Sequence, residues 1–316
     1  MRFLFSYIGV TETIIKVKRK DAGRYFMKEK KITGHLTALF TVMIWGTTFI
    51  SSKILLKDFT PVEVLFYRFV LGLVALMIVY PKPMKGTTWK QEVLMAVGGL
   101  SGITLYYLLE NVALTYTMAS NVSVIVSTAP IFTVLFCNML YKDEKRTGLK
   151  FFIGFLITMA GIWMISFNGA ALQLNPLGDF LSLLAAIMWG IYSAAYKKIT
   201  SFGYPVIQTT RRMFFYGVLF MIPFLFFMDF RFDISGFANP VYLLNILYLG
   251  FGACALCFLT WNYAVTKLGA VKSSFYIYLV PVITVVMSSI ILKEEMTLIA
   301  LIGTVLTIVG LFVSEG

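Results

Sequence analysis

Hydrophobic side chains follow one another in long runs along this chain, and short polar breaks separate the runs. Residues 36–56, LTALFTVMIWGTTFISSKILL, contain one charged side chain, that of Lys53. A helix that crosses a bilayer needs about 20 predominantly apolar residues. The pattern predicts ten such helices with short connections and no separate soluble domain. Their expected ranges are Leu36–Leu56, Pro61–Tyr80, Glu92–Thr115, Ala119–Tyr141, Gly148–Phe167, Gly178–Lys198, Pro205–Met228, Tyr242–Thr266, Ala270–Ile291 and Thr297–Val313.

The composition also indicates a membrane protein. Of the 316 residues, 59% are hydrophobic and 13% are charged. Soluble domains carry about a quarter charged residues, so this chain has too little charge to cover a globular surface in water. Its three cysteines lie in apolar runs and predict no disulfide framework. The C-x-x-C spacing of Cys254 and Cys257 lies within FGACALCFLTW, where helix packing is the favoured interpretation.

Basic residues mark one side of the predicted bundle. Of the 27 Lys and Arg residues, 20 fall in the amino-terminal arm and in alternate connections, whereas Lys57, Arg231 and Lys293 fall on the other side. Cytoplasmic loops are enriched in Lys and Arg. Both termini are therefore expected to be cytoplasmic, in a multi-pass protein of the cell membrane. The net charge of +12 follows from this topology and needs no nucleic-acid partner.

The second half of the chain repeats the first. Trp45-Gly46 recurs as Trp189-Gly190, 144 residues later. Further matches follow in order along the chain: Arg68 with Arg212 at the same offset, Asn111 with Asn262, Ser123 with Ser274 and Pro130 with Pro281 at an offset of 151, and Gly154, Thr158 and Gly161 with Gly303, Thr307 and Gly310 at an offset of 149. Residues 1–33 then form a basic arm, and residues 34–167 and 178–316 form two five-helix repeats.

Because each repeat has an odd number of helices, the second repeat begins on the opposite side of the membrane from the first, and its orientation is inverted. The predicted fold class is therefore an all-α integral membrane protein with ten transmembrane helices arranged as two inverted five-helix repeats. Inverted repeats around a site at the bilayer midplane are typical of secondary transporters that work by alternating access.

Several segments resemble the drug/metabolite transporter superfamily, and within it the ten-helix EamA-type transporters. The first half contains YTMASNVSVIVSTAPIFTVLF and GLKFFIGFLITMAGIWMI, and the second half repeats the pattern in KLGAVKSSFYIYLVPVITVVMSSIILKEEMT. MIWGTTF and FYRFVLG match the first two helices. The resemblance implies transport of a small metabolite across the inner membrane, often outward. It does not specify the substrate, because members of the family move chemically diverse solutes.

Aromatic and polar side chains at mid-depth are the candidates for substrate binding. Trp45 and Trp189 lie at the centres of the first and sixth predicted helices, where an indole ring offers a broad apolar face and one donor. Alternatively, the adjacent glycines simply let these two helices approach. Tyr106 and Glu110 are four residues apart and share a helix face. The full candidate set is Trp45, Trp189, Tyr106, Glu110, Asn111, Ser123, Asn262 and Tyr276.

Three further residues are expected to control access. Pro130 and Pro281 lie at the centres of the fourth and ninth predicted helices, where proline removes a backbone hydrogen bond, and they are predicted hinges. Arg68 shares a depth with Glu110 and could pair with it. In a functional role, the pair would be a gate on the outward side or a titratable site that couples transport to protons. In a structural role, it would be a salt bridge that joins the second and third helices. In the second repeat Trp261 occupies the position that matches Glu110.

Catalytic motifs are missing from the sequence. His35 is the only histidine, and no phosphate-binding loop of the G-x-x-x-x-G-K-[ST] type occurs. We therefore predict a transporter rather than an enzyme, without a cofactor or a metal, whose partners are the lipid bilayer and a small-molecule substrate. Both proton-coupled and facilitated transport stay open. Export of an amino-acid-like solute is favoured, and the alternative is import of an organic cation such as a quaternary ammonium compound, which aromatic faces attract.

The first residues of the arm are expected to be dispensable. The apolar start of residues 1–26 is too short to span a membrane, and no small-residue cleavage site follows it. MKEKK begins at Met27 and directly precedes the first predicted helix. It resembles a translation start followed by the positively charged residues that flank a membrane helix. Deletion of residues 1–26 should leave membrane insertion and transport intact. Membrane fractionation and transport assays of the deletion variant test this, and a collapse of either property would contradict it.

Overall fold

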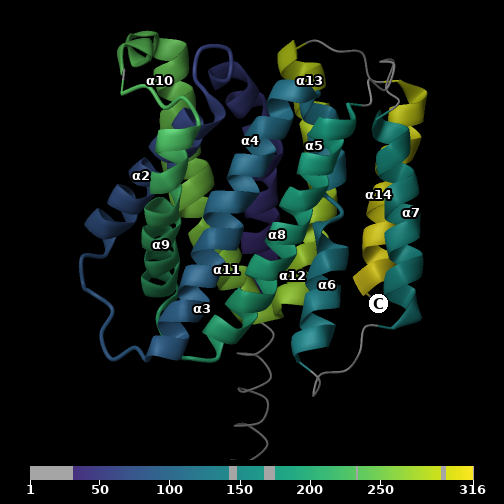
Figure 1. Cartoon of the computed structure of the whole chain (residues 1–316). Helices are drawn as coiled ribbons and strands as arrows, with labels where there is room; N and C mark the ends of the chain where they lie inside the picture. The colour runs from purple at the N-terminus through teal and green to yellow at the C-terminus, as the bar shows by residue number, and fades with distance from the viewer. Residues whose placement is uncertain (1–30, 142–147, 167–174, 233, 293–296, 316) are drawn as a thin grey trace, which may run out of the picture.

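The computed structural model describes residues 31–141, 148–166, 175–232, 234–292 and 297–315. These residues form an all-helical bundle without strands (Figure 1). The predicted arm, residues 1–33, lies almost entirely outside the described residues. Within the described ranges, eight helices are long and apolar enough to cross a membrane: Lys31–Leu55, Pro61–Val79, Trp89–Tyr116, Asn121–Leu140, Pro176–Thr200, Val206–Phe227, Pro240–Leu268 and Ala270–Met287. Two shorter apolar helices are Leu149–Met164 and Leu301–Ser314.

Apart from the short 3₁₀ helix η2, which lies in a predicted connection, the helical elements that follow the first helix (Lys31–Leu55) fall within a few residues of the predicted ranges. They are α2 (Pro61–Val79), α3 (Trp89–Gly99), η1 (Leu100–Leu105), α4 (Tyr106–Tyr116), α5 (Ala119–Val126), α6 (Ala129–Leu140), α7 (Leu149–Ser166), α8 (Pro176–Thr200), α9 (Val206–Phe227), η2 (Ser235–Ala238), α10 (Pro240–Leu247), η3 (Tyr248–Leu256), α11 (Cys257–Leu268), α12 (Ala270–Ser274), η4 (Phe275–Tyr278), α13 (Leu279–Leu292) and α14 (Leu298–Glu315).

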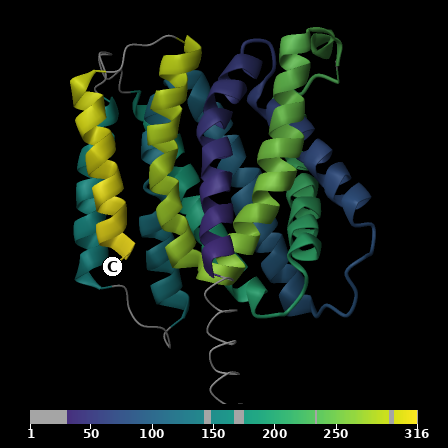
Figure 2. The ribbon, with the colours of Figure 1, turned by 180° about the vertical axis from the view of Figure 1, so that it is seen from behind.

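The first helix runs through the centre of the bundle. Seen from behind, it lies between α11 and α13, whereas α7 and α14 stand side by side at one edge in both views (Figure 2). The start of the first helix and the end of α14 lie at the same end of the bundle. The described helices therefore begin and finish on one side of the molecule.

Two of the long helices contain a π-helical segment at matching positions. η1 joins α3 to α4 and ends at Leu105, and η3 joins α10 to α11 and ends at Leu256. These end points are 151 residues apart, which is the offset that relates the two halves of the sequence. A π-helical turn inserts an extra residue into a helix and often occurs at functional sites. Here η1 comes directly before Tyr106, the first residue of α4.

The start of α2 is fixed by a capping box. The Thr60 hydroxyl accepts a hydrogen bond from the Glu63 backbone N–H, the Glu63 carboxylate accepts one from the Thr60 N–H, and Pro61 occupies the first turn. Arg231, in the connection after α9, binds the same carboxylate at 2.9 Å. These contacts anchor the helix that carries Arg68.

The two Trp-Gly dipeptides bring the helices that carry them close to their neighbours. A Cβ on Gly46 would lie 2.5 Å from Cγ2 of Ile283 on α13, and one on Gly190 would lie 2.6 Å from Cβ of Phe132 on α6. Phe132 and Ile283 are 151 residues apart, so the contacts are equivalent in the two halves. The closest neighbours of these glycines therefore lie on α13 and α6, and not on each other's helix.

Both predicted hinge prolines follow an interruption in their helix. α5 ends at Val126 and α6 begins at Ala129, with Pro130 in its first turn. In the second half, the short 3₁₀ helix η4 ends at Tyr278, just before α13 and Pro281. Proline is well tolerated in a first turn because the N–H it lacks would have no helical partner. The hinge role of both prolines stays a prediction.

Small residues bring α7 and α14 into direct backbone contact. A Cβ on Gly154 would lie 2.6 Å from the carbonyl oxygen of Gly310, and one on Gly161 would lie 2.6 Å from the carbonyl oxygen of Gly303. Helix association in membranes relies on such close packing, because lipid offers no hydrophobic driving force between helices. The matched glycines of the two halves thus form the interface between their last described helices.

We expect Gly154→Ala to lower the apparent unfolding temperature of the detergent-solubilised protein. The added methyl group would press against the α14 backbone, which cannot rotate away, and overpacking of this kind costs about 1–3 kcal/mol. Gly148→Ala is the matched control, because a Cβ there meets nothing within 4 Å. Equal thermal unfolding of the two variants would show that the α7–α14 contact is not as tight as described.

Candidate functional site

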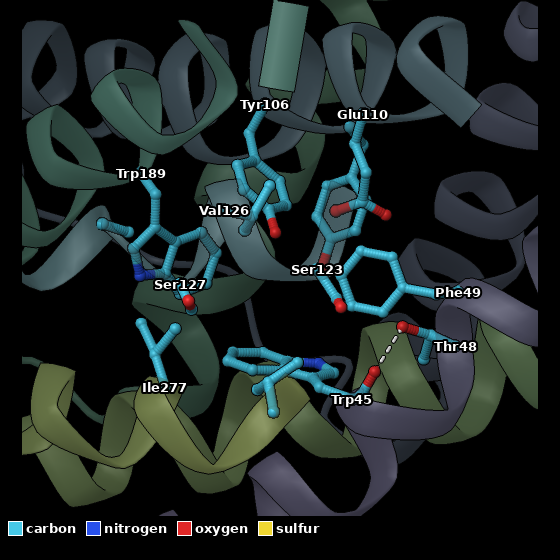
Figure 3. A pocket seen from close by; sticks show the side chains of 13 residues that line it. Trp45, Thr48, Phe49, Tyr106, Glu110, Ser123, Val126, Ser127, Trp189 and Ile277 are labelled. Atoms are coloured by element: carbon cyan, nitrogen blue, oxygen red, sulfur yellow. Dashed lines mark hydrogen bonds between the residues drawn. The ribbon is translucent and has the colours of Figure 1, made fainter. Parts of the chain in front are cut away.

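A small cavity lies in the centre of the bundle and is lined by residues of both halves (Figure 3). Its volume is about 30 Å³, which is room for about two water molecules. The cavity is thus smaller than an amino acid in this conformation. The lining residues are Trp45, Thr48, Phe49, Tyr106, Tyr107, Glu110, Ser123, Val126, Ser127, Ala129, Trp189, Ile277 and Val280.

Aromatic rings form much of the cavity wall. Trp45 and Trp189 meet edge to face, with ring centroids 5.2 Å apart and an interplanar angle of 88°. Tyr106 packs on Trp189 with centroids 5.0 Å apart. Aromatic rings prefer such edge-to-face and tilted arrangements because their faces are negative and their edges positive. The wall therefore presents ring faces and edges that would accept an apolar or a cationic group.

The two indole N–H groups differ in their partners. Nε1 of Trp45 donates to the carbonyl oxygen of Ala253 in η3 at 3.1 Å. Nε1 of Trp189 is buried and has no hydrogen-bond partner among the described residues. Because a buried donor without a partner costs free energy, the Trp189 N–H is a candidate contact for a bound solute.

Glu110 is the one charged residue that lines the cavity. It projects from α4 into the cavity beside Tyr106 (Figure 3), and it is 2% exposed. Its Oε1 has no hydrogen-bond partner within the described part of the chain. An ionisable side chain within a membrane protein is expensive unless it is paired or hydrated, and is a functional candidate by default.

The predicted ion pair between Arg68 and Glu110 is not present. The ion pairs within 4.0 Å that the described residues form are Arg212 with Glu92 and Arg231 with Glu63. Arg68 instead places its guanidinium 4.4 Å from the ring centroid of Tyr107. A structural salt bridge between α2 and α4 is therefore wrong for this conformation, because an aromatic ring occupies the place of the expected partner.

Arg68 itself is fully buried behind the cavity wall. Its Nε donates to Sγ of Cys254 in η3 at 3.2 Å, and its two terminal nitrogens have no hydrogen-bond partner in the described structure. Cys254 is a free and buried thiol. Its role as an acceptor for a guanidinium had no sequence signal.

Of the eight predicted substrate-binding residues, five line the cavity: Trp45, Trp189, Tyr106, Glu110 and Ser123. Asn111, Asn262 and Tyr276 lie outside it. The Asn111 Nδ2 donates to the carbonyl oxygen of Pro61 at 3.2 Å, and thereby ties α4 to the start of α2.

The other two residues outside the cavity also make contacts between helices. Asn262 accepts from the Tyr192 hydroxyl at 2.6 Å and donates to Thr210 at 2.9 Å. The Tyr276 hydroxyl pairs with Nδ1 of His35 at 2.7 Å. Each of these side chains is thus engaged in linking two helices in this conformation.

Sequence spacing could have found some of the lining residues that the prediction missed. Thr48 and Phe49 follow Trp45 by three and four residues and so share its helix face. Thr48 also donates to the Trp45 carbonyl oxygen at 2.7 Å (Figure 3). Ile277 and Val280 had no such signal, because η4 breaks the helical spacing before α13.

Long apolar helices that pack around a small central cavity define the class of multi-pass membrane proteins. The EamA-like transporter family model matches this chain twice, at residues 32–167 and 176–315. The chain belongs to the EamA-like transporter family.

Relatives across prokaryotes agree with this membership. A protein of Archaeoglobus fulgidus described as an uncharacterized transporter is 29% identical over 290 residues, which span 89% of this chain and 96% of that protein. A protein of Streptantibioticus cattleyicolor described as a "probable terminal-alkyne amino-acid exporter" is 26% identical over 275 residues, 86% of this chain and 90% of its own.

A solved crystal structure shares the fold. It superimposes with a TM-score of 0.69 at 18% sequence identity, and the match covers 90% of this chain and 97% of the other. At this identity the likeness concerns the fold alone. Family and relatives together make this chain a transporter of a small molecule, embedded in a membrane.

Proposed function

We propose that this chain is a secondary transporter that exports an amino-acid-like solute across the cytoplasmic membrane by alternating access. The observation that carries the proposal is a central cavity with one carboxylate, Glu110, opposite the aromatic rings of Trp45 and Trp189. A carboxylate suits the ammonium group of an amino acid, and indole faces suit an apolar side chain. The amino-acid exporter among the relatives supports the same solute class and direction.

Alternating access would use two inverted repeats of five helices each, residues 34–167 and 178–316, with both termini in the cytoplasm. The double match of the family model supports a repeat. So do the equivalent contacts of Gly46 and Gly190 and the matching π-helical segments η1 and η3. In such an architecture the two repeats exchange conformations, and the central site opens to each side in turn.

Transport would draw its energy from a proton gradient. Glu110 can hold either a proton or the ammonium group of the solute, so binding of one releases the other. Such competition couples the inward movement of protons to the outward movement of solute. The groups around this carboxylate are Tyr106 and Tyr107 on its own helix and Arg68 on α2.

Import of an organic cation is the second candidate function. Its support is the same cavity, whose sole charged lining residue is acidic and whose walls are aromatic. Quaternary ammonium groups bind to aromatic faces within about 6 Å of the ring centroid. An organic cation of this kind would bind to Glu110 and the aromatic rings. Because it has no carboxylate, it would need no basic residue in the site.

Efflux from liposomes that contain the purified protein tests the proposal. The liposomes are loaded with radiolabelled amino acids or quaternary ammonium compounds, one at a time, and an inward proton gradient is applied or omitted. We expect the gradient to accelerate efflux of at least one amino acid. Efflux of quaternary ammonium compounds alone would favour the second function, and no stimulated movement of any solute would contradict both.

A further inference from the structure

We propose that Arg68 is a carboxylate-binding residue that Tyr107 covers in the present conformation. When the Tyr107 ring swings away, the cavity extends to the guanidinium, and an amino acid binds as a zwitterion between Arg68 and Glu110. This inference rests on the proposed function and deepens it, because it assigns one protein charge to each charge of the solute.

The first argument is the unmet hydrogen-bonding capacity of Arg68. The residue is 0% exposed, and neither Nη1 nor Nη2 has a partner among the described residues. A guanidinium presents paired N–H groups in a fixed plane that matches the two oxygens of a carboxylate. Nη1 and Nη2, the terminal nitrogens that have no partner within the described ranges, are the atoms that donate to a carboxylate in such a contact.

The second argument is that no carboxylate of the described residues forms an ion pair with this buried cation within 4.0 Å. Tyr107 and Phe69 face the guanidinium, at 4.4 and 5.6 Å from their ring centroids, and Cys254 accepts from Nε. A cation–π contact offsets only part of the free energy that it costs to bury an ion. A negatively charged partner that arrives with the solute would compensate the remainder.

The third argument is the position of Tyr107. Tyr107 lines the cavity, and the guanidinium of Arg68 lies over the Tyr107 ring without lining the cavity itself. The ring therefore separates the guanidinium from the cavity in which a solute would bind. Glu110 lies three residues further along α4, on the adjoining part of the same helix face. The two charges of an amino acid are joined through one carbon atom, so a binding site for it needs both protein charges close together.

The second half of the chain provides the contrast. Arg212 matches Arg68 in the repeat, but its side chain is 32% exposed and pairs with Glu92 at 3.1 Å. Trp261 stands at the position that matches Glu110. The second half therefore pairs its arginine within the protein, whereas the first half has a buried arginine and a buried carboxylate that no ion pair joins.

Competition assays with Arg68→Met test the inference. The probes are the amino acid with the largest efflux in the liposome experiment and the amine that lacks its carboxylate. We expect the variant to bind the amino acid about tenfold to a hundredfold more weakly, the range for hydrogen bonds between charged groups. Binding of the amine should change by less than about twofold. Arg212→Met is the matched control and should leave the ratio of the two affinities unchanged.

A ligand series on the unaltered protein keeps the inference testable if Arg68→Met does not fold. The amino acid should bind at least tenfold more tightly than its methyl ester, which keeps the ammonium group and loses the negative charge. Equal binding of acid and ester, or an equal loss of amino acid and amine in Arg68→Met, would overturn the inference and leave the proposed function standing. Failure of the unaltered protein to move any amino acid would overturn both.

Discussion

Trp189→Ala should raise the KM for the transported solute about tenfold to a hundredfold, and Trp45→Ala should do the same. Both rings line the cavity and meet edge to face at 5.2 Å. Burial of a large apolar group against such a surface contributes about 1.5–3 kcal/mol, and each 1.4 kcal/mol is a factor of about ten in affinity. The measurement is the concentration dependence of efflux from liposomes with equal amounts of inserted protein.

Two other tryptophans serve as controls for this prediction. Trp261 is buried and contacts Trp45 at 5.1 Å, but it does not line the cavity. Trp261→Ala should therefore lower the unfolding temperature and change the KM less than Trp189→Ala does. Trp163 is 60% exposed on α7, and its replacement should alter neither property. Unchanged KM values in both cavity variants would show that the two rings serve packing alone.

Glu110→Gln should abolish the pH dependence of transport in a protein that still folds. The amide keeps the shape of the side chain but binds neither a proton nor the ammonium group of the solute, so gradient-driven efflux should be lost at every pH. Because no protein cation pairs with Glu110 within 4.0 Å among the described residues, its replacement breaks no salt bridge. The measurements are thermal unfolding and the rate of efflux over a series of pH values.

Glu63→Gln is the matched control for folding. Glu63 is also buried, at 1% exposure, but it accepts hydrogen bonds from Thr60 and forms an ion pair with Arg231. Loss of this buried carboxylate removes the acceptor that holds the start of α2 and the exposed Arg231, which lowers stability. Glu63→Gln should therefore unfold at a lower temperature than Glu110→Gln, with its transport still dependent on pH. A Glu110→Gln variant that is stable and keeps the normal pH profile would rule out a role for Glu110 in coupling.

Much of the fold could be predicted from the sequence, because helix length and apolar character are local properties. The expected Pro61–Tyr80 helix is α2, Pro61–Val79, and the expected Gly148–Phe167 helix is α7, Leu149–Ser166. The matched glycines of the repeat were visible as well. Their partners were not, since contacts such as Gly46 with Ile283 depend on how distant helices pack.

The candidate site was only partly predictable, because residue type does not reveal which face of a helix turns inward. Trp45 and Trp189 line the cavity, as their central positions indicated, and Glu110 lines it as well. Asn111 and Asn262 seemed equally suitable by type, but their amides link helices instead. A polar side chain inside a membrane can serve either purpose, and only the packing of the neighbouring helices decides between them.

The contacts of Arg68 could not be predicted from the sequence either. Equal depth in two neighbouring helices predicted that Arg68 and Glu110 could pair, but no ion pair within 4.0 Å joins them. The choice of partner depended on the rotamer of Tyr107, whose ring lies under the guanidinium. No spacing rule along the chain predicts a rotamer.

Counterflow into liposomes that contain only the purified protein tests the central claim, transport of a solute through the Trp45–Trp189 cavity. Liposomes are loaded with an unlabelled amino acid, and entry of the same labelled amino acid is followed without any gradient of protons. We predict transient accumulation of label in liposomes with the unaltered protein and much slower accumulation with Trp189→Ala. Accumulation no greater than in protein-free liposomes, or equal in protein and variant, would contradict the account.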